Sequence, residues 1–314
     1  MHKESIRYAS NRPHSRPATR RTACVPPVTE VRVILAPNTG PMTGSGTNTY
    51  ILGRGDVVMI DPGPDDPSHR AALLAALGPT ERVAAILITH SHVDHTALAP
   101  AIRAVTGAPV WGAGRAGSGR SATMATWAAR NLAGGGEGFD LSYCPDRVLR
   151  QCETLQIGDL TIEVIATPGH TGCHLSFACG DLLFSGDTAM GWSTSLVSPP
   201  DGDMAAYMTS LNTLAARMWR VIHPGHGPAI LWPAARLADL IAHRKIREAE
   251  ILAALSDHGP ATCDMLAARI YAATPSFLLP AAARNVLAHL IDLTDRGMVS
   301  FADGDTPDGI FARI

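Results

Sequence analysis

The strongest constraint on this chain is a short segment in which four candidate metal ligands crowd together after an apolar run. Residues 83–89 form a continuous, β-branched apolar stretch, which is typical of a buried strand. They lead into Thr89-His90-Ser91-His92-Val93-Asp94-His95, and a helix is predicted at 97–105. The donors His90, His92, Asp94 and His95 are therefore expected in a loop at the carboxyl end of a strand, where α/β proteins bind ligands.

Three further candidate ligands directly follow later predicted strands, at residues 160–166, 182–185 and 221–222. They are His170, Asp187 and His226, and each is directly preceded by a glycine. Glycine permits tight turns and a close approach of the backbone to an ion. A lone histidine is more often a surface or core residue, but this joint pattern favours a metal site. Imidazole and carboxylate donors without cysteine suit zinc, and also manganese or iron.

The other predicted elements fit an α/β sandwich. Strands are predicted at residues 31–35, 49–53, 57–61, 109–112 and 175–178, and helices at 68–77, 123–131 and 205–217. The turn Gly53-Arg54-Gly55-Asp56 is a hairpin signal. Strands followed by helices, twice over, predict the sandwich.

The C-terminal part is predicted to be a small winged-helix domain. Helices at 236–255, 262–272 and 280–296 precede a hairpin at 298–301 and 309–314. We place the catalytic domain at residues 30–242 and the winged-helix-like domain at 243–314. The third helix is poor in the cations that DNA recognition needs; it carries Arg284, His289 and Arg296 against Asp292 and Asp295. We therefore expect no DNA binding, and instead packing against the sandwich or a homodimer interface.

The N-terminal residues 1–29 are rich in arginine and proline and are predicted to be a disordered tail. An arginine-rich, acid-poor leader can also be an organelle transit peptide. Residues 1–30 hold six basic and two acidic residues, so the net charge of −2 for the whole chain leaves −6 on the remainder. This mildly acidic body argues against a large nucleic-acid surface.

The composition predicts a cytoplasmic protein. Apolar residues make up 46% of the chain and charged residues 17%, which is globular rather than disordered. No apolar run approaches the roughly 18 residues of a membrane helix, and no secretory segment is evident, so we expect no membrane association. The six cysteines form no C-x-x-C pair, which predicts reduced thiols rather than a disulfide framework or a thiolate zinc site.

The ligand pattern resembles the metallo-β-lactamase superfamily over about residues 31–233. The H-x-H-x-D-H segment, with the later His, Asp and His, carries the resemblance. It implies an αββα sandwich with two metal ions at one edge. It also implies ligand roles: one ion on His90, His92 and His170, the other on Asp94, His95 and His226, and Asp187 as the bridge. Asp61, in Ile60-Asp61-Pro62-Gly63, matches a carboxylate that supports the metal loop.

Within that superfamily the chain is similar to the β-lactamase-like protein 2 group of hydrolases. The matching stretches are Gly46-Thr47-Asn48-Thr49-Tyr50, Thr167-Pro168-Gly169-His170-Thr171, Phe184-Ser185-Gly186-Asp187, Pro224-Gly225-His226-Gly227-Pro228 and His243-Arg244-Lys245-Ile246-Arg247-Glu248. The group carries a C-terminal winged helix; its animal members resemble endoribonucleases, and fungal relatives act as thioesterases on polyketides. The chain departs from the group at His223, where an aromatic residue is commoner, and at Gly44-Ser45, where bulkier residues are usual.

The main expectation is a hydrolase with two divalent ions, zinc first, whose bridging hydroxide attacks a small or carrier-bound ester or thioester. Asp94 would orient the hydroxide or accept its proton. The alternatives are a metal-dependent endoribonuclease, for which RNA is the substrate, and a non-catalytic binding protein. His243, Arg244 and Lys245 are candidates for contacting an anionic substrate group, or form only a solvated helix face.

Overall fold

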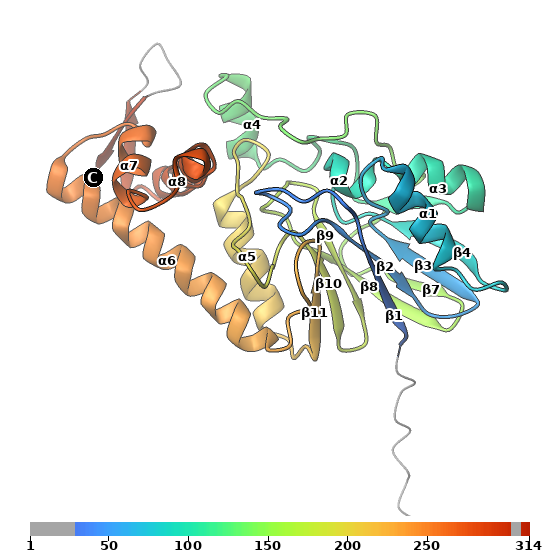
Figure 1. Ribbon diagram of the computed structural model, residues 1–314. Helices are drawn as coiled ribbons and strands as arrows, with labels where there is room; N and C mark the ends of the chain where they lie inside the picture. Colours follow the sequence, from blue (N-terminus) through green and yellow to red (C-terminus); the bar gives the residue numbers. More distant parts are fainter. Residues whose placement is uncertain (1–28, 303–308) are drawn as a thin grey trace, which may run out of the picture.

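The computed structural model describes residues 29–302 and 309–314, so the predicted tail lies outside the described residues except for Thr29. Two sheets lie face to face with helices on their outer sides, and a smaller helical unit follows (Figure 1). This architecture confirms the predicted αββα sandwich. No helix in the described part of the chain combines the length and the apolar character needed to cross a membrane.

The first sheet has the strand order β1-β2-β3-β4-β5-β6. Its antiparallel half pairs β1 to β2 and β2 to β3, and its parallel half runs from β3 to β6. The strands are β1 (Val31–Leu35), β2 (Asn48–Leu52), β3 (Asp56–Ile60), β4 (Arg82–Leu87), β5 (Val110–Gly112) and β6 (Arg147–Val148). Helix α1 (Pro67–Ala75) connects β3 to β4, and α2 (Val93–Thr96) and α3 (Ala99–Thr106) lie between β4 and β5.

The second sheet has the order β11-β10-β9-β8-β7, in which only β10 and β11 are parallel. Its strands are β7 (Thr154–Ile157), β8 (Leu160–Ala166), β9 (Leu175–Cys179), β10 (Leu182–Gly186) and β11 (Val221–Pro224). Helix α5 (Met204–Ala215) covers its outer face. Strands β8, β10 and β11 therefore end shortly before the three downstream candidate ligands, which are His170, Asp187 and His226.

Three apolar layers hold the sandwich together. The central layer lies between the sheets and includes Leu87 and Phe177. A second layer joins the first sheet to α1 and α3 and includes Ile86. Neighbouring residues of β4 thus enter different layers, because both faces of this strand are covered; that is why its sequence is continuously apolar. The third layer joins the second sheet to α5 and includes Leu183 and Leu211.

The C-terminal unit has the predicted helices and hairpin. Its elements are α6 (Pro233–His258), α7 (Cys263–Ile270), the 3₁₀ turn η1 (Ser276–Leu278), α8 (Leu279–Asp295), β12 (Val299–Ala302) and β13 (Ile310–Arg313). Helix α6 runs without interruption from the sandwich into this unit (Figure 1). Residues 242 and 243 lie inside α6, so a domain division at this point stays a prediction.

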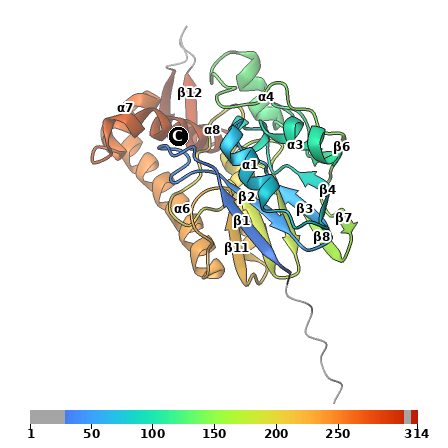
Figure 2. The same ribbon diagram turned by 45° about the vertical axis from the view of Figure 1, so that its right-hand side comes forward.

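An insertion from the sandwich completes the core of the C-terminal unit. Helix α4 (Ala122–Ala129) lies beside α8 in both views (Figure 2). The ring of Trp127 packs against Phe301 at 4.9 Å and Phe311 at 6.5 Å between centroids. Met124 and Leu132 belong to the same apolar cluster as α6, α7 and α8. The packing role predicted for the winged helix is therefore mutual, since the sandwich also supplies part of its core.

Candidate metal centre

The structure brings together all seven residues predicted as metal ligands. Residues 88–92 connect β4 to α2 and carry His90 and His92, and α2 itself carries Asp94 and His95. The other three residues follow β8, β10 and β11 in the second sheet. Both sheets thus contribute to one site at a common edge of the sandwich.

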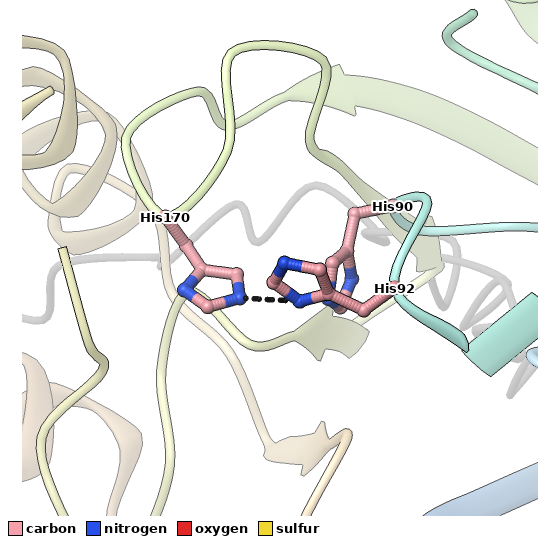
Figure 3. A group of neighbouring side chains, drawn as sticks. All are labelled: His90, His92 and His170. Atoms are coloured by element: carbon pink, nitrogen blue, oxygen red, sulfur yellow. Dashed lines mark hydrogen bonds between the residues drawn. The ribbon is translucent and has the colours of Figure 1, made fainter. Parts of the chain in front are cut away.

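The first group consists of His90, His92 and His170, whose rings point toward one another from two separate loops (Figure 3). His92 Nδ1 lies 2.9 Å from His90 Nε2 and 3.2 Å from His170 Nε2. A tetrahedral zinc ion with bonds of about 2.0–2.1 Å holds its ligand atoms about 3.4 Å apart. The three nitrogens are therefore close to the spacing that one bound ion requires.

The second group consists of Asp94, His95 and His226. Asp94 Oδ2 lies 3.5 Å from His95 Nε2 and 3.3 Å from His226 Nε2. A carboxylate and two imidazoles at these distances make a second donor set of the kind that divalent ions use.

Asp187 lies between the two groups. Its Oδ2 is 3.6 Å from His170 Nε2 and 3.4 Å from His226 Nε2, so one oxygen approaches a member of each group. Its Oδ1 is 3.6 Å from His95 Nε2. This position is the one that a carboxylate shared by two ions would occupy.

Most of the histidines turn one ring nitrogen to the protein and the other to the centre. Four of them hold Nδ1 against a neighbour: His90 against Thr89 Oγ1, His95 against Asp61 Oδ2, His170 against the Leu196 carbonyl and His226 against the Gly46 carbonyl. Contacts of this kind fix the tautomer and the orientation of a ligating imidazole. Their Nε2 atoms are thereby directed at the centre.

Asp61 supports the metal loop at three points. It accepts hydrogen bonds from the Thr89 backbone N–H at 2.8 Å and from the Thr89 hydroxyl at 2.7 Å. Its Oδ2 also lies 2.9 Å from His95 Nδ1. Asp61 is buried with a positive φ of 49°, an uncommon conformation for a residue other than glycine. These contacts agree with the expectation that Asp61 supports the metal loop.

Two atoms at the centre fit a cation because they are buried without a hydrogen-bond partner among the described residues. They are His95 Nε2 and Asp187 Oδ1. Buried polar atoms in proteins are normally satisfied, so an unpaired donor set of this chemistry is what a metal ion would complete.

The glycines before the downstream ligands allow these close approaches. A Cβ added at Gly225 would lie 2.3 Å from Asp187 Oδ1, and one at Gly186 would lie 2.8 Å from His174 Nε2. At Gly169, φ is +140° and a Cβ would collide with the backbone of Tyr207. A side chain at any of the three positions would displace the loop that carries the ligand.

At the centre, burial and neighbouring charges shift the pKa values of His95 and Asp187 in opposite directions, and the charges prevail. Burial would lower the pKa of His95, but Asp94, Asp187 and Asp61 outweigh it and raise that pKa to about 10. Burial would raise the pKa of Asp187, but His226 and His95 hold that pKa well below its usual range. The carboxylates therefore favour positive charge at this point, and a divalent ion would compete with protons for it.

The imidazoles of His90 and His92 are kept neutral. Burial lowers the pKa of His90 well below its ordinary value, and the neighbouring His95 and His92 lower it further. Burial and the adjacent His170 lower the pKa of His92 to about 3. Neutral imidazole is the form that binds metal, so these two rings are in the ligating state at neutral pH.

The sequence did not indicate which contacts hold the centre in place, although Thr47 and Asn48 lie in a stretch that matches the group. Thr47 Oγ1 donates to Asp94 Oδ2 at 3.0 Å, and Asn48 Nδ2 donates to the carbonyls of Pro224 and Gly227 around His226. These contacts join residues far apart in the chain, which no local pattern predicts. His174 is buried, and its Nε2 accepts the backbone N–H of Asp187 at 3.1 Å.

Trp192 is 43% exposed and lies beside the loop that carries His226. A Cβ on Gly44 would lie 3.2 Å from its six-membered ring, and one on Gly227 would lie 2.3 Å from Cδ1. The absence of a side chain at Gly44 thus leaves room for this ring. His223, the other departure from the group pattern, stacks on Phe184 with centroids 5.0 Å apart. It packs as an aromatic residue would.

The structure corrects the expectation for Arg244. Its side chain is only 2% exposed, so it neither meets solvent on a helix face nor reaches a substrate there. Lys245 is exposed and His243 is half-buried. In the described part of the chain, no hydrogen bond or ion pair joins these two residues to the seven candidate ligands. A substrate contact by His243 or Lys245 stays a prediction.

Comparison with known proteins gives two matches to families. Residues 42–226 match the metallo-beta-lactamase superfamily, and residues 262–306 match the beta-lactamase associated winged helix domain. The chain is 31% identical over 275 residues to a protein of Caenorhabditis elegans named beta-lactamase-like protein 2 homolog; the match covers 85% of this chain and 84% of that protein.

Two further comparisons extend this result. An Aspergillus fumigatus protein named atrochrysone carboxyl ACP thioesterase is 28% identical over 232 residues, which cover 71% of this chain and 64% of that protein. The crystal structure of a metallo-beta-lactamase family protein from Thermus thermophilus superposes with a TM-score of 0.71 at 24% identity. The superposition covers 90% of this chain and 98% of that one, which supports the shared fold.

Proposed function

Since this chain belongs to the metallo-beta-lactamase superfamily and is a hydrolase, we propose that it binds two zinc ions and cleaves an ester or thioester bond. One ion would be held by His90, His92 and His170, and the other by Asp94, His95 and His226, with Asp187 shared.

The observation that carries this proposal is the position of the Asp187 carboxylate. It lies within 3.6 Å of a nitrogen from each group, and one of its oxygens is buried without a partner among the described residues. A single-metal site would leave one complete donor set unused. The two sets together supply imidazole and carboxylate ligands for two ions.

The residues at the centre suit hydrolysis. Bound divalent ions would supply a nucleophilic hydroxide at neutral pH and polarise the oxygen of the scissile group. The side chain of Asp94 is 22% exposed and that of Asp187 is 10% exposed. Asp94 is therefore the carboxylate that can meet an incoming substrate, orient the nucleophile and take up its proton. Thr47 holds it in place.

An acyl substrate is favoured over RNA. Residues 31–314 carry a net charge of −6, which repels a polyanion unless a local basic channel offsets it. The thioesterase name of the A. fumigatus relative supports the acyl class. Small or carrier-bound thioesters are the substrates we propose. We also propose a cytoplasmic location, since the six cysteines of the sequence form no C-x-x-C pair and suit reduced thiols.

We further propose that the winged helix does not bind DNA. Helix α8 stands where a recognition helix would, but much of it is committed to internal packing. Val286, Leu290 and Ile291 are buried in the domain core, and Arg284 bonds to Ser198 in the sandwich. A duplex would have to displace these contacts.

The test has two parts on one protein preparation. Elemental analysis of protein grown in metal-supplemented medium should give about two zinc ions per chain, and a reproducible value near zero would contradict the metal proposal. The zinc-loaded protein is then offered acyl thioesters, aryl esters, lactones and labelled RNA. Turnover of thioesters or esters supports the acyl class. Cleavage of RNA alone would replace it with the endoribonuclease.

A further inference from the structure

The winged helix unit reaches the metal centre through residues 195–199. The Leu196 carbonyl in this segment lies 2.6 Å from His170 Nδ1 and accepts a hydrogen bond from its N–H, which leaves Nε2 for the centre. The sequence places Leu196 in a loop, residues 193–200, that could line a substrate cleft, but no pattern in it indicates a role in orienting a ligand. Leu196 matters because side chains of the C-terminal unit hold the peptide groups on both sides of it.

Two side chains fix the peptide groups on either side of Leu196. Arg244 in α6 donates to the Ser195 carbonyl and, at 3.0 Å, to Asn285 Oδ1 in α8. The same Asn285 oxygen accepts the backbone N–H of Val197 at 3.0 Å. One asparagine oxygen thus ties α6, α8 and the loop together.

The contact to Val197 determines where the Leu196 carbonyl points. The Leu196 C=O and the Val197 N–H belong to one planar, trans peptide group, so they point in opposite directions. When Asn285 holds the N–H on one side, the carbonyl is held on the other side, toward His170. Asn285 therefore sets the acceptor that orients a candidate ligand without touching that ligand.

The burial of Arg244 is hard to explain by packing alone. Its guanidinium contacts neutral groups, namely the Ser195 carbonyl, Asn285 Oδ1 and the ring of Tyr207 at 5.2 Å. Its Nε is buried without a partner among the described residues. A buried cation without a carboxylate is costly, and an apolar side chain would pack at lower cost. The charge is retained where it anchors Ser195 and Asn285.

We propose that Arg244 and Asn285 are positioning residues for the metal ligand His170, so that the winged helix is a working part of the metal centre. The inference rests on the proposed function in so far as it treats His170 as a ligand. It differs from a role in substrate binding, because both side chains act from the side of His170 that faces away from the centre.

The experiment compares four variants with the parent. Asn285→Ala removes the shared acceptor, whereas Asn285→Asp keeps an acceptor oxygen for both Val197 and Arg244. Arg244→Lys keeps the charge but replaces two guanidinium nitrogens, one bonded to Ser195 and one to Asn285, by a single ammonium nitrogen on a shorter side chain, so the geometry of the two bonds is not reproduced. Lys245→Ala removes a charge from the adjacent, exposed position and is the matched control.

Two readouts separate positioning from simple stability. Long-range ¹H–¹⁵N spectra of the imidazoles report the His170 tautomer without any metal. Cobalt titration by absorbance reports the dissociation constants of the two ions. We expect Asn285→Ala to lose the single Nδ1-protonated tautomer and to bind one of the two ions about tenfold or more weakly. Arg244→Lys should fall between it and the parent, while Asn285→Asp and Lys245→Ala should match the parent.

The outcomes distinguish this inference from the proposed function. If Asn285→Ala lowers the melting temperature but keeps the tautomer and both dissociation constants, the residue is only structural and the inference is overturned. If the parent has the predicted tautomer and the variant loses it, the positioning is supported even when the metal count differs from two. A parent that binds no metal would overturn the proposed function, and with it the ligand role of His170.

Discussion

Thr47 donates a hydrogen bond to the carboxylate of Asp94 across a gap of 47 residues, with 3.0 Å between Thr47 Oγ1 and Asp94 Oδ2. The same hydroxyl accepts a hydrogen bond from Asn38 Nδ2 at 2.9 Å. Asn38 thus orients the Thr47 hydroxyl, and this hydroxyl holds Asp94, the more exposed of the two central carboxylates, in one orientation.

Thr47→Val should lower kcat/KM by about ten- to a hundredfold, because a hydrogen bond to a charged group contributes about 1.5–3 kcal/mol. Valine has the same shape but no hydroxyl. Thr47→Ser keeps the hydroxyl and should stay close to the parent. Steady-state kinetics on the substrate found by the screen measure the effect; equal rates for the valine and serine variants would exclude a contribution from the hydrogen bond.

Asp94→Ala should reduce turnover by about 10²–10⁴-fold while the fold is retained, since a positioned proton acceptor contributes about that much. The side chain is partly exposed, so its loss leaves no large cavity. Circular dichroism checks the fold, and Asp65→Ala at an exposed turn position is the control. Activity within a few-fold of the parent would show that Asp94 has no such role.

The sequence predicted the sandwich because its strands are long apolar runs between clear turn signals. The hairpin of β2 and β3, the covered strand β4 and the end of α3 at Gly107 are as predicted. Strand β7 was missed because it has no continuous apolar run: only Leu155 and Ile157 are apolar and buried, and the polar positions that alternate with them are exposed.

The grouping of the candidate ligands was predictable because all of them come after strands, and strands of a sheet that run in the same direction, as β8, β10 and β11 do, end at one edge. Their supporting contacts were not. The Leu196 and Gly46 carbonyls act through the backbone, which any residue supplies. Arg244 was misread because a charged run in a helix is normally exposed, whereas the packing of α6 against α5, α8 and the loop of Ser195 buries this side chain.

His289 in α8 should make the protein sensitive to mild acid. Burial is the main reason why the pKa of His289 falls to about 3, and Arg244, His243, Arg296 and Arg247 lower it further. The unfolded chain regains a pKa of about 6.5. Between these values only the unfolded state binds this proton, so stability is lost as the pH falls from 6.5 toward 3.

His289→Leu should remove that loss, because both ring nitrogens are buried without a partner among the described residues. The free energy of unfolding of the variant, relative to the parent, should rise by about 1.4 kcal/mol for each pH unit of acidification in this range. Urea unfolding at pH 6.5, 5.5 and 4.5 measures it, with His258→Leu at an exposed position as the control. Parallel curves for variant and parent would contradict the prediction.

Trp127→Ala should destabilise the C-terminal unit by about 3–5 kcal/mol, the usual cost of removing a large buried aromatic side chain. Trp127→Phe should cost less because it keeps a ring against Phe301 and Phe311. Hydrogen exchange of the amides in α7 and α8 locates the loss. Unchanged protection in these helices would show that α4 is not part of that core.

During synthesis, Trp127 leaves the ribosome long before Phe301 and Phe311, which are its aromatic partners in the finished protein. Until those partners are made, the indole on α4 has no aromatic cover. Exposed apolar surface on a partly folded chain favours aggregation and the binding of chaperones. A nascent chain arrested between His226 and Phe311 carries every candidate ligand and still lacks the cover for α4. Chaperones and proteases would therefore encounter a chain that already has all candidate metal ligands but still exposes the apolar surface of α4.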